Sequence, residues 1–145
     1  MRDYEPIIDV LCAQRDLYMR LQEVLQKERK ALVSFNHEEI EEIAKEKDSL
    51  VLQAQLLEEQ RKRLVDEFFQ DSSTPKGIMD LYEETGDERF RNLRFALISL
   101  LQAIQEANEV NRYFIERAFQ HIHGGLSFLQ QYIQSQAGTT LSREA

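Results

Sequence analysis

The chain has 145 residues, a formal net charge of −8 and a pI near 4.9. That length suits a single domain, and five glycines and two prolines are too few for the turns of an all-β fold. The acidic balance offers no positive field for nucleic-acid phosphates, and the sequence contains no run of about 18 apolar residues that would predict membrane insertion. Alanine, glutamate, lysine, leucine, arginine and glutamine make up over half of the chain, which favours helices.

The N-terminal residues and the cysteine content both indicate the cellular compartment. The first residues, Met1–Glu5, lack the apolar core of a signal peptide. Cys12 is the single cysteine, so no disulfide can form within the chain. We therefore expect a reduced, cytoplasmic setting.

Two long amphipathic helices are predicted over 6–34 and 37–69. Apolar residues recur at alternating steps of three and four from Ile7 and again from Ile40, and each stripe is apolar at seven of nine positions. The segments are nearly equal in length and almost no residues separate them. An antiparallel helical hairpin is the simplest fold for this pattern.

Cap residues set the expected boundaries. Pro6 suits the first turn of a helix, and Asn36 followed by Glu39 resembles a capping box. Thr74 before Pro75 reads in the same way, as an N-cap followed by the first helical position. A short helix is therefore predicted at roughly 75–85.

The last predicted helix, 87–133, is longer than either helix of the hairpin. Gly86 should end the short helix and Asp87 should cap the long one. At 1.5 Å per residue the hairpin helices reach about 45–50 Å, so the long helix must overhang or bend at Gly124–Gly125. Residues 134–145 are expected to form a flexible tail. The predicted fold is a single all-α domain: an elongated hairpin with a third long helix, as a coiled-coil-like three-helix bundle.

The most informative feature is a gap in charge. Residues 118–142 contain no Asp, Glu, Lys or Arg, although about a third of the residues elsewhere are charged. Apolar and aromatic residues alternate there with glutamines. This mixture suits a surface that meets another protein, because apolar residues can be buried without stranding charges. The alternative is that the segment is the buried end of the bundle followed by a loose tail.

A stripe of large apolar residues in and before this gap is the candidate binding surface. Its members follow one another at steps of four and three: Ile115, Phe119, Ile122, Leu126 and Leu129. Asn108 and Asn111 precede them on the same face. A polar residue at a seam position can fix register or partner, so both asparagines are candidate binding residues. The alternative is a pair of core asparagines satisfied by water or by a neighbouring helix.

Chemistry-bearing motifs are not found. The sequence has no Gly-rich phosphate loop, no G-x-S-x-G elbow, no H-E-x-x-H and no Glu-x-x-His pair of the di-iron type. His121 and His123 are two residues apart, which places them on different sides of a helix and disfavours a shared metal ion. We predict no catalytic residue, no metal and no cofactor.

Several segments together resemble the FlgN-type flagellar export chaperones. The matching segments have the order and spacing of that family. Glu38–Val51 contains the family's spaced Ile, Lys and Leu, and Gln55–Arg61 contains its Leu-Glu followed by Arg. Further along the chain, the matches are the N-x-x-N of Asn108–Asn111, the pair Leu126 and Leu129, then Tyr132 and Gly138. The resemblance covers nearly the whole chain.

The resemblance implies a small cytoplasmic helical protein that binds the C-terminal segments of hook–filament junction proteins before their export by the flagellar type III apparatus. It also implies docking on the cytoplasmic domain of the export gate through a tail tyrosine, which by position is Tyr132. A homodimer in the absence of client is a further possibility. Two alternatives remain: a structural coiled-coil adaptor that homo-oligomerises through its apolar stripe, and a helical enzyme or metal bundle.

Overall fold

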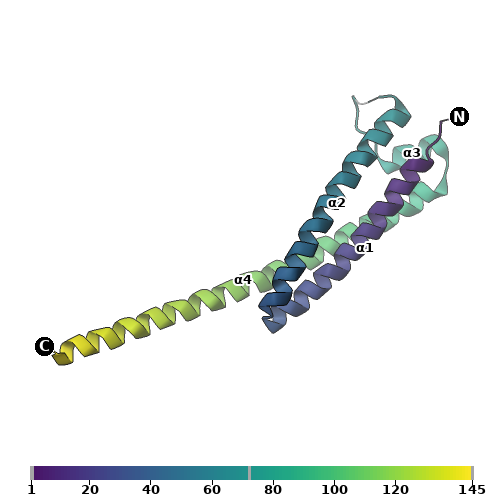
Figure 1. Ribbon diagram of the computed structural model, residues 1–145. Helices are drawn as coiled ribbons and strands as arrows, with labels where there is room; N and C mark the ends of the chain where they lie inside the picture. The colour runs from purple at the N-terminus through teal and green to yellow at the C-terminus, as the bar shows by residue number, and fades with distance from the viewer. Residues whose placement is uncertain (1, 72, 145) are drawn as a thin grey trace.

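The computed structural model describes residues 2–71 and 73–144, with side chains up to Ser135. These residues form four helices and no strand, which confirms the all-α prediction. The helices are α1 (Glu5–Ser34), α2 (His37–Phe69), α3 (Ile78–Thr85) and α4 (Glu88–Glu144). Figure 1 shows α1 and α2 as an antiparallel pair, with α4 running beside them and then far beyond their turn.

The turn between α1 and α2 has the predicted chemistry. Phe35 adopts a left-handed conformation with a φ of 54°, and its N–H bonds to the end of α1. Asn36 is the N-cap of α2, and its side chain accepts a hydrogen bond from the Glu39 N–H at 3.3 Å. Two residues therefore reverse the chain, so the hairpin helices match the predicted 6–34 and 37–69 to within one residue.

The short helix begins later than predicted. Gly77 rather than Thr74 is its N-cap, and the Gly77 N–H donates to the Asp80 carboxylate at 2.7 Å. Pro75 lies in the non-helical connection before it, where Lys76 Nζ is 5.8 Å from the Phe69 ring centre. The prediction failed because the chain must first cross from the end of α2 to α3, and Pro75 and Lys76 are part of that connection.

The last helix also runs past its predicted end. The prediction stopped it at residue 133 and assigned 134–145 to a flexible tail, but α4 continues to Glu144. Residues 134–144 contain one glycine and no proline, so nothing in them stops a helix. The helix is also unbroken at Gly124–Gly125. Its 57 residues reach about 85 Å at 1.5 Å per residue, so the helix overhangs rather than bends.

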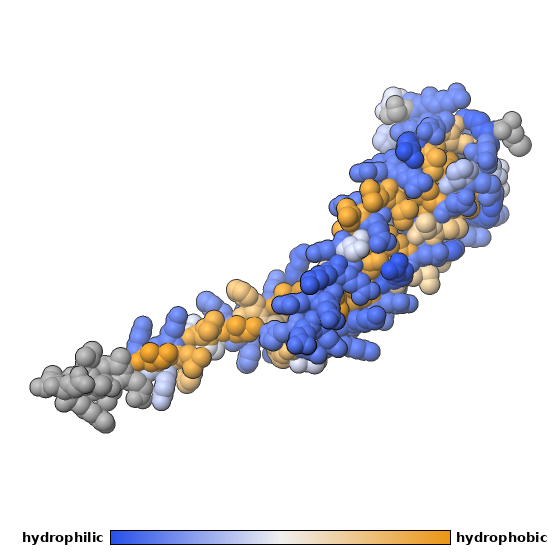
Figure 2. Space-filling model, viewed as in Figure 1, coloured by the Kyte–Doolittle hydropathy of each residue, from blue (hydrophilic) through white to orange (hydrophobic). Residues whose placement is uncertain are grey.

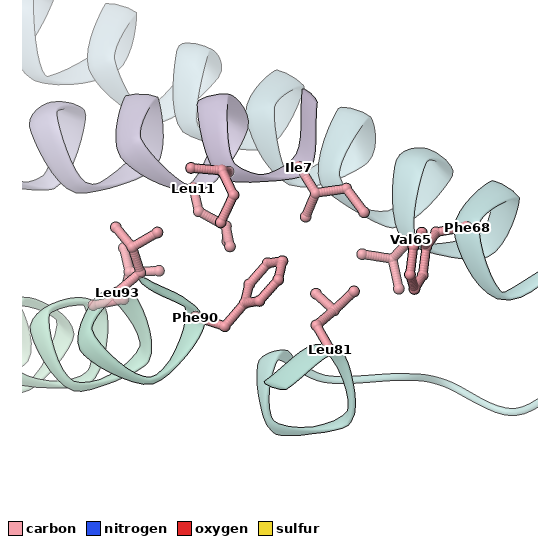
Figure 3. Close-up of a cluster of buried hydrophobic side chains, with 9 residues drawn as sticks. Ile7, Leu11, Val65, Phe68, Leu81, Phe90 and Leu93 are labelled. Atoms are coloured by element: carbon pink, nitrogen blue, oxygen red, sulfur yellow. The ribbon is translucent and has the colours of Figure 1, made fainter. Parts of the chain in front are cut away.

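α1 is the centre of the bundle, because it packs along both α2 and α4, while α3 packs on α4. One buried cluster lies at the end that carries the N-terminus, where side chains of all four helices point toward one another (Figure 3). A second cluster continues the core toward the α1–α2 turn and ends on α4 at Ile104. Among the described residues, no helix is long and apolar enough to cross a membrane.

Candidate binding surface

Asn111 marks the point beyond which the bundle no longer buries α4. That side chain is only 2% exposed, and it is the last fully buried residue of α4 among the described side chains. Beyond it, Phe114, Ala118 and Ser127 are half-buried and the other described side chains are exposed. We call the part of α4 after Asn111, residues 112–144, the projecting segment.

A buried polar group fixes this exit point. Asn111 Nδ2 donates to the Leu25 carbonyl oxygen at 2.9 Å and to Glu28 Oε1 at 2.8 Å. Lys47 Nζ donates to the same Glu28 carboxylate at 3.2 and 3.3 Å. The Glu28 carboxylate therefore links α1, α2 and α4. Only one register of α4 along α1 places Asn111 where it can donate to this carboxylate.

The two asparagines consequently have different surroundings. Asn111 is inside the bundle, satisfied by a neighbouring helix, as one of the sequence alternatives had it. Asn108 is exposed one turn earlier. Of this pair, only Asn108 is accessible to a partner in the free chain.

The predicted stripe is exposed along its whole length. Each of its five residues, from Ile115 to Leu129, has between 45% and 69% of its surface accessible. Figure 2 shows apolar surface, in orange, along the rod that leaves the bundle. The structure adds Ile133, which is exposed and continues the spacing by four residues. We call these six residues the apolar row: Ile115, Phe119, Ile122, Leu126, Leu129 and Ile133.

The predicted stripe ended at Leu129, although Ile133 also lies within the predicted helix 87–133. The signal for Ile133 was present, since the same four-residue step leads to it from Leu129. Exposure on this scale is unusual for a monomeric soluble protein, in which contiguous apolar patches are small. The row therefore has the character of an interface.

Two more aromatic residues lie on other sides of the projecting segment. At 100° per residue, Phe128 is on nearly the opposite side of the helix from the row, and Tyr132 is about 100° away from it. Both are exposed. Tyr132, the candidate docking residue, is thus part of a helix rather than of a loose tail.

The first turns of the projecting segment touch the tip of the hairpin. The Phe35 ring lies 6.0 Å from the His121 ring, and Arg29 lies over the Phe114 ring at 5.9 Å. His123 instead stacks on Phe119 at 6.2 Å. The two histidines thus contact different aromatic rings. Among the described residues, no three His, Cys, Asp or Glu side chains gather as a metal site would require.

Charged groups with shifted pKa values lie elsewhere. The Arg89 guanidinium bridges Glu5 and Asp87 and holds the pKa of the Asp87 carboxyl well below its usual range. The Arg61 side chain likewise lowers the pKa of Glu58. Both groups brace the bundle, whereas the row contains no ionisable side chain. Any binding by the row itself must rest on apolar contact.

Comparison with known proteins places this architecture. The sequence model described as FlgN protein matches residues 1–142, which include both the bundle and nearly all of the projecting segment. The chain belongs to the FlgN family. A search of curated proteins and a search of solved structures found no significant match.

Membership confirms the resemblance drawn from the sequence. FlgN proteins are flagellar export chaperones, a class defined by binding other proteins rather than by catalysis. The helical bundle described above is consistent with that role and with type III secretion.

Proposed function

We propose that this chain is a cytoplasmic chaperone for the C-terminal helical regions of hook–filament junction proteins, and that it delivers them to the flagellar type III export gate. The observation that carries the proposal is the apolar row, exposed on a helix that extends beyond its own bundle. Family membership supplies the class of partner. Binding there would keep a client segment from assembling prematurely.

The geometry favours a helical client. The row is a single stripe about 27 Å long from Ile115 to Ile133, which matches the apolar face of an amphipathic helix. Phe119, as its largest member, would be the central anchor. From residue 118 onward the glutamines and serines around the row carry no charge, so burial of that part by a client leaves no Asp, Glu, Lys or Arg without a partner.

The two asparagines would contribute differently. Asn108 is accessible and could hydrogen-bond a client that continues toward the bundle. Asn111 would act indirectly, because its bonds to Leu25 and Glu28 hold α4 in the register that presents the row. Opening the bundle would be needed for Asn111 to touch a client.

Tyr132 is the proposed contact for the export gate. Its position about 100° from the row leaves its hydroxyl face free when a client occupies the row. Client and gate could then be held at once, which delivery requires. Tyr132→Ala should weaken binding of the gate's cytoplasmic domain and leave client affinity within about twofold.

A matched pair of variants tests the row. Phe119→Glu and Phe128→Glu make the same change at two exposed phenylalanines, on the row and on nearly the opposite side. Titration calorimetry would use synthetic peptides of the junction proteins' C-terminal regions. Phe119→Glu should lower affinity by about 30-fold or more, because it buries an unpaired charge. Phe128→Glu should change it less than threefold; equal losses, or none, would exclude the row.

The second candidate is a structural coiled-coil adaptor, favoured by the same apolar row. It predicts a stable oligomer that client peptides do not dissociate. Sedimentation of the chain with and without an excess of peptide separates the two functions, because only the chaperone exchanges partners.

A further inference from the structure

The apolar row reads the same in both directions. Its six residues are separated by steps of four, three, four, three and four, and the sequence midpoint is Gly124. Two copies placed antiparallel about that midpoint would bring apolar residues together in every layer. The pairs would be Ile115 with Ile133, Phe119 with Leu129, and Ile122 with Leu126, each formed twice.

We propose that a second copy of this chain covers the row in the free protein, with the two projecting segments packed antiparallel about Gly124. The row is the continuation of the face that packs on α1 inside the bundle, through Ile104 and Asn111. Because α1 ends at Ser34, that face has lost its own partner at the point where the row begins. A second α4 supplies a helix of equal spacing.

The charges favour this partner and this direction. Each chain carries a net charge of −8, but residues 118–142 contribute nothing to it. In the antiparallel arrangement, Arg112, Glu116 and Arg117 of one copy face only uncharged residues near position 131–136 of the other. A parallel pair would instead place Glu116 beside Glu116 and Arg117 beside Arg117.

The bundles themselves also stay apart only in the antiparallel arrangement. Asn111 is 13 residues from the midpoint, so the two Asn111 residues would be about 39 Å apart along the helices, and each hairpin tip, which contacts His121 through Phe35, would stay on its own side of the midpoint. A parallel pair would hold them side by side.

The dimer would also affect client binding. Only this effect rests on the proposed chaperone function; the dimer itself does not. The second copy and the client would use the same row, so each would exclude the other. The free row would be masked from aggregation, and a client would convert a dimer into two loaded monomers. Because the contact has only six layers of side chains, we expect a dimer dissociation constant of about 1–100 μM, which is weak enough for a client to replace the second copy.

The association is tested first without any client. Sedimentation equilibrium of the full chain should show a mass that rises with concentration from 17.1 kDa toward twice that value. Phe119→Glu should raise the dissociation constant at least about 30-fold, whereas Phe128→Glu should change it less than threefold. A chain that stays monomeric up to about 300 μM overturns the proposal, as does equal loss in both variants. Circular dichroism checks that each variant keeps its helices.

Complementary charges test the register. Phe119→Lys and Leu129→Glu chains should each be monomeric at about 50 μM. Mixed in equal amounts they should dimerise, because an antiparallel pair then sets lysine against glutamate once and Leu129 against Phe119 once. A mixture that stays monomeric overturns the antiparallel register, since a parallel pair would restore neither contact.

Cysteine cross-linking gives an independent measurement of direction. In a Cys12→Ala background, Ile115→Cys and Ile133→Cys chains should form an interchain disulfide only when mixed. Each variant cross-linking with itself would show a parallel pair and overturn the proposal. None of these results requires a client, so failure of the dimer leaves the chaperone function standing, and failure of client binding leaves the dimer standing.

Discussion

The start of α4 and the described part of its projecting segment have similar residue types and opposite surroundings. At its start, Phe90 is fully buried among side chains from the other three helices (Figure 3). Further along the same helix, Phe119 is 69% exposed. Periodicity gave both residues a place on an apolar stripe. What separates them is whether another helix lies alongside, because hydrophobicity drives burial only where a partner is within reach.

Charge distribution distinguishes the two regions as clearly as burial does. Near the start of α4, Arg89 bonds to both Glu5 and Asp87, and Tyr4 donates to Asp87 at 3.0 Å. The projecting segment has no such pairs beyond Arg117 in the described part of the chain. A region that closes on itself can use ion pairs to specify one packing, whereas a surface that accepts a partner avoids unpaired charges.

The largest expected effect contrasts the two phenylalanines directly. Phe90→Ala should lower the free energy of unfolding by about 3–5 kcal/mol, because it leaves a cavity in the core. Phe119→Ala should lower it by less than about 0.5 kcal/mol, as at an ordinary surface site. Urea denaturation of both variants at low protein concentration measures the difference. Similar losses would mean that the row is core.

The exit point of α4 should show an intermediate effect. Asn111→Ala removes two hydrogen bonds and leaves the Glu28 carboxylate with one fewer donor, so it should cost about 1–3 kcal/mol. Asn108→Ala is the matched control at an exposed position and should change stability by less than about 0.5 kcal/mol. Thermal melts of the two variants decide this. Equal values would show that the buried network does not hold the helix.

A smaller, pH-dependent effect is expected at the ion-paired end. The Arg89 side chain, the Arg89 N–H and the Tyr4 hydroxyl hold the pKa of Asp87 below its unfolded value of about 4. The stabilisation is therefore complete above about pH 5 and is lost as the pH falls. The stability of the wild-type chain should drop more steeply between pH 5 and pH 2 than that of Asp87→Asn. Parallel curves from denaturant titrations would refute the assignment.

The smallest effect on stability should come from the largest deletion. Removing residues 118–145 should change the free energy of unfolding by less than about 1 kcal/mol, because few contacts join them to the bundle. The same deletion should abolish client binding and self-association. Denaturation and sedimentation of the truncated chain test both parts. If the truncated chain is unfolded without denaturant, the deleted segment is part of the core.

Much of the fold was accessible from sequence because its signals are local. The 3-4 spacing from Ile7 and from Ile40, and the cap at Asn36, fixed the hairpin to within a residue. The start of α3 was missed because Pro75 was assigned to a helix, whereas it lies in the non-helical connection from α2 to α3. The end of α4 was missed because residues 134–145 were assigned to a flexible tail, although their single glycine, Gly138, costs a long helix only about 1 kcal/mol.

The candidate site divides in the same way. The sequence by itself determined that residues 115–129 form one apolar stripe within an uncharged stretch, since spacing and charge are properties of the chain. Only the tertiary structure decided which stripe residues have partners. Glu28, Lys47 and Asn111 come from three separate helices, and their meeting depends on how α1, α2 and α4 align. That alignment buries Asn111 and leaves Phe119 exposed, because packing ends where the shorter hairpin helices end.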